Sequence, residues 1–122
     1  MFRLIRELRS PAALRVAMLL PPLGVVQLAS YLRWSGHEAL VVDAVQERLG
    51  PAACARRVAD LAPEVIGFSV LTWNVWWVTQ AVAALRALGV SAPIVFGNIH
   101  AELFRESLLD QGHADYVVLG EG

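Results

Sequence analysis

The fold is decided by residues 64–97, "EVIGFSVLTWNVWWVTQAVAALRALGVSAPIVFG". An apolar run rich in β-branched residues comes first, an Ala-rich segment with helical spacing follows, and a second apolar run ends in Gly97. Uniformly apolar strands joined by a helix are typical of a parallel sheet that is covered on both faces. The stretch therefore predicts a β-α-β unit with strands at 64–71 and 93–97 and a helix at 74–89.

The same alternation extends to both sides of this unit. Further strands are predicted at 15–20, 38–44 and 115–120, and further helices at 23–36, from Pro51 to just before Pro63, and at 101–112. We expect an α/β domain at 15–122: a doubly wound, five-stranded parallel sheet forming a flavodoxin-like (Rossmann-like) three-layer sandwich. Residues 1–14 are predicted to be an N-terminal helical extension. Either this extension covers the fifth strand, or the chain is part of something longer.

Composition excludes several classes of protein. The chain has 122 residues, of which 57% are hydrophobic and 17% charged, and its net charge is −1. These values fit one globular domain, exclude disorder and leave no basic surface for nucleic acid. The single cysteine, Cys54, cannot form an internal disulfide or a thiolate cluster. It shares a helical face with Val58 and Leu61, which predicts a core position.

Two apolar segments call for comparison with membrane and secretory sequences. Residues 65–85 carry no charge, but polar side chains interrupt them, and the first half is strand-like while the second is helical. Near the N-terminus, Arg15 and then Pro21 interrupt the apolar segment, and no cleavage site of small residues follows. We therefore expect no membrane span and no signal peptide, and a cytoplasmic protein.

Ligands of such sheets bind beyond the carboxyl ends of the strands. This rule selects the loops 21–24, 69–74, 97–101 and 120–122. These loops lack the glycine-rich phosphate motifs, the Gly-x-Ser-x-Gly elbow, the His-x-x-x-His metal spacing and the acidic residues of a phospho-accepting receiver domain. Common nucleotide, hydrolase and receiver functions are thus disfavoured.

Some residues keep two interpretations. Asp43 either binds a ribose hydroxyl or caps the loop after its strand. Trp76 points away from the apolar stripe of its helix, so it either contacts a partner or a ligand, or is a tolerated surface aromatic. His100 suggests a metal ligand or an acid or base, but nothing near it in the sequence orients it or supplies a second ligand.

Four segments in order resemble a known family. They are "PPLGVVQLASYLRWSGHEALVVDA", "PEVIGFSVLTWN", "PIVFGNIHAE" and "DYVVLGEG". Together they resemble the N-terminal cobalamin-binding domain of B12-dependent radical SAM enzymes, over residues 16–122. The family pattern has Pro-Pro-x-Gly, Gly-His, Asp, Ser-x-x-Thr, Gly-Gly-x-His and Gly-Glu-Gly. Here these motifs fall at 21–24, 36–37, 43, 69–72, 97–100 and 120–122.

The resemblance implies a corrinoid across the carboxyl edge of the sheet, with its nucleotide tail between sheet and helices. It implies that cobalamin is bound base-off, with no histidine ligand from the protein, because the first loop has none. His100 is then expected to hydrogen-bond rather than to bind cobalt. The residues implied to bind the cofactor are Pro22, Leu23, Gly24, Ser69, Thr72, Asn74, Gly97, Asn98, His100, Gly120, Glu121 and Gly122. Asn98 stands where the family has its second glycine.

The resemblance also implies a partner that this chain does not contain. A [4Fe-4S] cluster that cleaves S-adenosylmethionine needs a Cys-x-x-x-Cys-x-x-Cys motif, and one cysteine cannot supply it. The chain alone is expected to have no catalytic residue and to serve a radical SAM domain, in cis or in trans, of a methyltransferase or cyclase. The alternative is a non-catalytic docking or regulatory module of the same fold that has lost cobalamin binding.

Overall fold

The computed structural model describes residues 21–120. Its backbone forms two compact units, Met1–Arg48 and Leu49–Gly122. The predicted helical extension at 1–14, the predicted strand at 15–20, and Glu121 and Gly122 lie outside the described residues.

The first unit contains helix α3 (Leu23–Trp34), as predicted. The helix begins after Pro22, since proline fits a helix start but not a helix interior. It ends at Trp34, and the chain turns away two residues later at Gly36, whose φ of 90° is a left-handed conformation that glycine adopts at little cost. The His37 amide there donates to the Leu32 carbonyl, which satisfies a carbonyl of the last turn.

The predicted strand at 38–44 is wrong. Residues 37–43 have no strand pairing, and a turn follows at 44–48. The apolar run alone did not make a strand, because a strand is stabilised by its hydrogen-bonded neighbours. Oδ1 of Asp43 accepts hydrogen bonds from the amides of Val45 and Gln46, at 3.1 Å each. Asp43 therefore caps the turn.

The second unit is built on a parallel sheet with the order β1-β2-β3. Its strands are β1 (Ile66–Ser69), β2 (Ile94–Gly97) and β3 (Tyr116–Val117). They lie within the predicted strands but are shorter. Within residues 21–120 the sheet has three strands, so the prediction of five is not met there.

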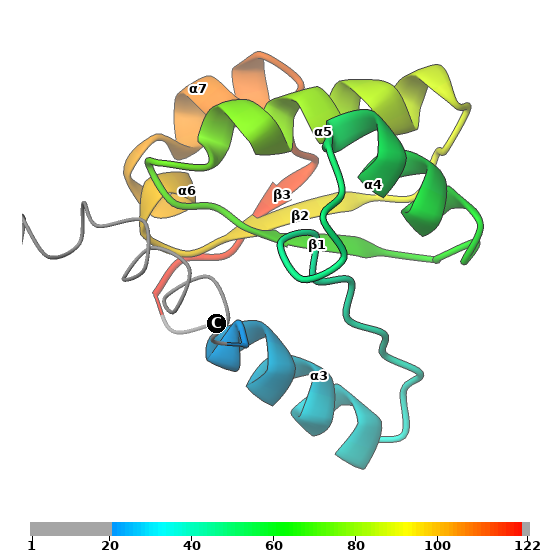
Figure 1. Cartoon of the computed structure of the whole chain (residues 1–122). Helices are drawn as coiled ribbons and strands as arrows, with labels where there is room; N and C mark the ends of the chain where they lie inside the picture. Colours follow the sequence, from blue (N-terminus) through cyan, green and yellow to red (C-terminus); the bar gives the residue numbers. More distant parts are fainter. Residues whose placement is uncertain (1–20, 121–122) are drawn as a thin grey trace, which may run out of the picture. The chain divides into compact units, whose positions relative to one another are not determined.

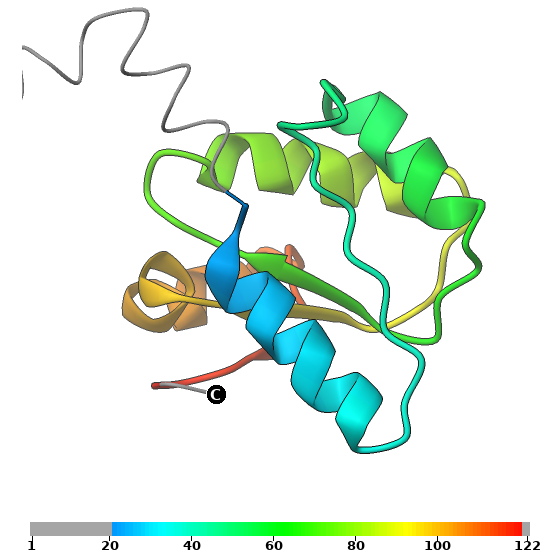
Figure 2. The same cartoon turned by 60° about the horizontal axis from the view of Figure 1, so that its bottom comes forward.

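Four helices accompany the sheet: α4 (Pro51–Ala59), α5 (Val75–Ala87), α6 (Ile99–Leu103) and α7 (Arg105–Asp110). Figure 1 shows α4, α5 and α7 on one side of the strands, and α4 and α5 also lie side by side in Figure 2. The three-layer sandwich thus stays a prediction. The single helix predicted at 101–112 is wrong, because the chain leaves helical geometry at Phe104 (φ −115°, ψ 23°).

The core lies between the sheet and α5. Ile94 and Phe96 are fully buried. The apolar face of α5 packs against them through Val78, Val82 and Leu85. Burying each side chain of this size contributes about 1.5–3 kcal/mol. Cys54 is also buried, as predicted. No helix within residues 21–120 has both the length and the apolarity that a bilayer crossing demands.

A polar clamp holds the amino end of the sheet. Nη1 of Arg86 donates to the carbonyls of Val90 and Ala92, and its Nη2 donates to Oδ2 of Asp115 at 2.7 Å. The same Oδ2 accepts from the Ile94 amide at 2.7 Å. One guanidinium and one carboxylate thereby tie the end of α5 to the starts of β2 and β3.

Candidate functional site

The candidate site is the carboxyl edge of the three strands in the second unit. Parallel pairing in the register Ser69 to Gly97 brings the loop after β1 beside the loop after β2. The segment after β3 reaches the same place, since the Gly120 amide donates to Oε2 of Glu102 in α6 at 3.2 Å. We call the loops 69–74 and 97–101, together with Gly120, the ligand edge.

The structure brings seven of the twelve candidate residues to the ligand edge: Ser69, Thr72, Asn74, Gly97, Asn98, His100 and Gly120. Pro22, Leu23 and Gly24 lie in the first unit, at the start of α3. Glu121 and Gly122 are outside the described residues. For all twelve residues the role in cofactor binding stays a prediction.

Asn74 organises the loop after β1. Its Oδ1 accepts from the Leu71 amide at 2.8 Å, and its Nδ2 donates to the Ser69 carbonyl at 3.1 Å. Both ends of the side-chain amide are thus used within the loop. Asn74 thus shapes the edge, and it stands at the N-cap position of α5 without a side-chain hydrogen bond to that helix.

Two side-chain hydrogen bonds cross from one loop to the other. Nδ2 of Asn98 donates to Oγ of Ser69 at 3.0 Å, and Oγ1 of Thr72 lies 3.1 Å from Nδ1 of His100. The backbones are joined as well, because the Val70 amide donates to the Gly97 carbonyl and the His100 amide to the Val70 carbonyl. The two loops therefore form one connected edge.

His100 is oriented by its neighbours. Its ring stacks on Phe104 with centroids 4.5 Å apart and an interplanar angle of 28°. Nδ1 faces Thr72, and when Thr72 donates to it, Nε2 carries the ring proton and can donate to an acceptor. Within residues 21–120 no group of three or more His, Cys, Asp or Glu could hold a metal ion. The structure shows His100 hydrogen-bonded to Thr72, and its role toward a cofactor stays a prediction.

The hydrogen-bonding side chains of the two loops include no acidic residue, lysine or arginine. They are two hydroxyls, two amides and one imidazole, and none of these five is a carboxylate or a cationic side chain. A Cβ added at Gly97 would meet no atom within 4 Å, as is also true of the other glycines that the structure describes, so space lies open beside the backbone there but is not particular to this edge. Beside the two loops, the carboxyl group of Glu102 accepts from the Gly120 amide.

Sequence reasoning missed two aromatic residues near the edge. Phe104 stacks on the His100 ring from the residue that directly follows α6, and the spacing of four residues between them was the available signal. Trp73 directly follows Thr72 and is 76% exposed. Trp76 is 70% exposed, as its outward position on α5 predicted.

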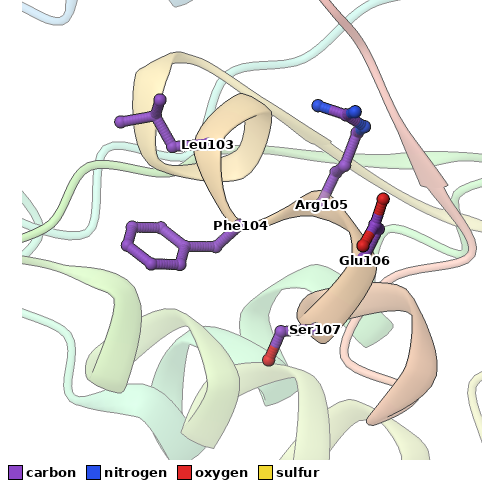
Figure 3. Close-up of a pocket in the computed structure, with 5 residues that line it drawn as sticks. All are labelled: Leu103, Phe104, Arg105, Glu106 and Ser107. Carbon is purple, nitrogen blue, oxygen red and sulfur yellow. The ribbon is translucent and has the colours of Figure 1, made fainter.

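A shallow hollow lies where α6 meets α7. Figure 3 shows the side chains that line it, from Leu103, Phe104, Arg105, Glu106 and Ser107. All five belong to one continuous segment, and none comes from the loop after β1. The hollow is thus a feature of the helix junction and not the candidate site.

A comparison with protein families gives this edge its context. The model of the B12 binding domain matches residues 9–122. No curated protein and no solved structure matches the chain. The matched region includes the ligand edge and all three strands. The chain belongs to the B12 binding domain family, whose domains are flavodoxin-like.

Proposed function

We propose that this cobalamin-binding domain holds its corrinoid at the ligand edge. The observation that carries the proposal is the cluster of neutral donors and acceptors from two adjoining loops. A corrin ring is a wide, mostly apolar plate with amides around its rim. It needs small residues where the backbone comes close and uncharged partners for its amides. Gly97, Ser69 and Thr72 meet these needs.

Each polar residue has a distinct part in this proposal. Ser69 and Thr72 offer hydroxyls, and His100 offers a ring nitrogen for a rim amide. Gly97 leaves room for the plate, since nothing lies within 4 Å of a Cβ built there. The set of proposed contacts is completed by Pro22, Leu23, Gly24, Asn74, Asn98, Gly120, Glu121 and Gly122.

We propose further that the corrinoid is bound base-off and without a protein ligand to cobalt. The loop 21–24 contains no histidine. His100 has one nitrogen beside Thr72 and a ring face covered by Phe104. When bound, the corrinoid supplies a cobalt centre that can carry a methyl group, and this chain supplies the neutral cradle.

The parent reaction is proposed to be that of a B12-dependent radical SAM enzyme, of the methyltransferase or cyclase type. The support is the order and spacing of the loop motifs. Reading the gene beyond the codon for Gly122 tests this directly, as does a search for a separate partner chain. A Cys-x-x-x-Cys-x-x-Cys motif would support the proposal, and its absence from both would contradict it.

Cobalamin binding itself has a simple test. The purified full chain is mixed with hydroxocobalamin, desalted, and examined by visible absorption under oxidising and reducing conditions. Retention of the corrinoid spectrum at about one equivalent is expected. A colourless protein under both conditions would contradict the proposed site and favour the alternative, a docking or regulatory module. Asn98 and the exposed Trp76 are the features that speak for that alternative.

A further inference from the structure

Asn98 has a backbone conformation that an asparagine rarely adopts. Its φ of 79° and ψ of 173° lie in a region used almost only by glycine. Holding another residue there costs on the order of 1–3 kcal/mol, so surrounding contacts must offset the strain. Strain of this kind at a ligand edge is a reason to ask what the residue does.

Its side chain makes the contacts that hold it in place. Oδ1 accepts from the Ile99 amide at 2.7 Å, and Nδ2 donates to Oγ of Ser69 at 3.0 Å. The first bond is local, but the second crosses 29 positions of sequence to the end of β1. Asn98 thus fastens the start of α6 to the loop after β1.

This fastening lies where a ligand must come closest to the backbone. Gly97, the preceding residue, has open space beside it, whereas position 98 fills its space with an exposed amide. The amide also holds a lone pair of the Ser69 hydroxyl that an amide of the ligand would otherwise use. A ligand therefore competes with Asn98 for both space and a hydrogen bond.

We propose that Asn98 is a positioning residue that gates the ligand edge and lowers its affinity for a corrinoid. The inference rests on the corrinoid-binding function proposed above. In the free protein the Asn98 amide holds Ser69 and joins the two loops, and ligand entry requires this bond to open. Glycine at position 98 removes the side chain and accepts the backbone angles without strain.

The test is a titration of the full chain with hydroxocobalamin, followed by visible absorption. Asn98→Gly is expected to lower Kd about tenfold, the factor that corresponds to one hydrogen bond of ordinary strength. In a Ser69→Ala background the same substitution is expected to lower Kd by clearly less than about tenfold, because the crossing bond is already gone and only the bulk of the Asn98 side chain is removed.

A second measurement does not depend on the ligand. Amide hydrogen exchange of the free protein should quicken in segments 69–74 and 97–104 of both single variants, while segment 78–87 of α5 keeps its protection. Retained protection in α5 also shows that each variant is folded. If Asn98→Gly loses the protection of α5, the exchange of Ser69→Ala tests the gate instead. That variant removes the same hydrogen bond by replacing its other partner.

Each outcome has a defined meaning. Tighter binding by Asn98→Gly than by the wild type supports the gate. Binding by that variant alone supports the gate but overturns the proposed function of the wild-type chain. Wild-type binding with equal or weaker binding by Asn98→Gly overturns the gate and leaves the proposed function standing. Failure of both proteins to bind overturns the proposed function and the gate with it. Unchanged exchange at 97–104 in the variants also overturns the gate.

Discussion

His100 lies where two neighbours limit its chemistry. Thr72 approaches Nδ1 at 3.1 Å and the Phe104 ring lies against one face of the imidazole. A side chain held in this way is suited to present Nε2 in one fixed direction, as an oriented hydrogen-bonding group. The distinction between a hydrogen-bonding and a cobalt-binding histidine can be measured.

We expect His100→Ala to weaken hydroxocobalamin binding about three- to tenfold, because one hydrogen bond of ordinary strength is lost. The reduced, cobalt(II) form should show no nitrogen superhyperfine splitting in its electron paramagnetic resonance spectrum, in the wild type or in the variant. Splitting in the wild type that His100→Ala removes would identify His100 as a ligand. Splitting in both would show that the cofactor's own base stays bound.

Thr72→Val is the matched variant for this measurement. It preserves shape and removes the hydroxyl that faces Nδ1. We expect a loss of affinity similar to that of His100→Ala, and little further loss when the two are combined, since they act through one hydrogen-bonded pair. Fully additive losses would show that the two side chains act independently.

At the scale of elements, α5 carries the largest share of the core contacts. Leu85, on the sheet-facing side of α5, is fully buried. Leu88, directly after the helix, is 50% exposed. Leu85→Ala should lower the free energy of unfolding by about 2–5 kcal/mol, and Leu88→Ala by less than about 1 kcal/mol. Urea denaturation measures both, and equal losses would contradict the packing described for α5.

The clamp at the amino end of the sheet gives a second element-scale prediction. Asp115→Ala should lower the free energy of unfolding by about 1–2 kcal/mol, since it removes the partner of Arg86 and of the Ile94 amide. The estimate is kept low because Arg86 and Asp115 are 36% and 47% exposed. Glu64→Gln, an exposed carboxylate before β1, is the control and should leave stability unchanged in the same urea titration.

The elements also show what sequence patterns can predict. Residues 64–97 gave β1, α5 and β2 correctly, because a strongly apolar β-α-β unit specifies itself through local pattern and turn residues. The run at 38–44 has the same apolar character without a described partner strand, so its pattern did not predict its structure. The break between α6 and α7 at Phe104 was not predicted, because no glycine or proline marks it in the sequence.

For the candidate site, the loops were predictable but the contacts within them were not. Topology alone places Ser69, Gly97 and Gly120 at one edge of a parallel sheet. The hydrogen bond between Asn98 and Ser69 depends on the backbone angles of one residue, which a sequence does not display. The two hydrogen bonds of the Asn74 amide within its own loop were likewise not visible in the sequence.

At the scale of the whole molecule, cofactor binding should appear as stability. A ligand that binds only the folded chain raises the free energy of unfolding by about 2.7 kcal/mol at one hundred times its Kd. We expect hydroxocobalamin to raise Tm by several degrees at that concentration. Differential scanning calorimetry at increasing cofactor concentration measures the effect. A Tm that does not change with cofactor concentration would contradict it.

Leu85→Ala provides the control for this experiment. Leu85 belongs to α5, lies in the core and is not a residue of the ligand edge. Its variant should start from a lower Tm and gain the same free energy from the cofactor, because distant and independent contributions add. A much smaller gain would mean that the core and the edge are coupled.

The exposure of Trp73 has an optical consequence. Its indole directly follows Thr72 and is 76% exposed beside the ligand edge. A corrinoid absorbs light in the range where indole emits. A bound corrinoid therefore quenches the fluorescence of a nearby tryptophan by resonance energy transfer. Tryptophan fluorescence thus reports whether the ligand edge is occupied by a corrinoid. Replacing Trp73 with phenylalanine would show how much of the quenching comes from that one ring.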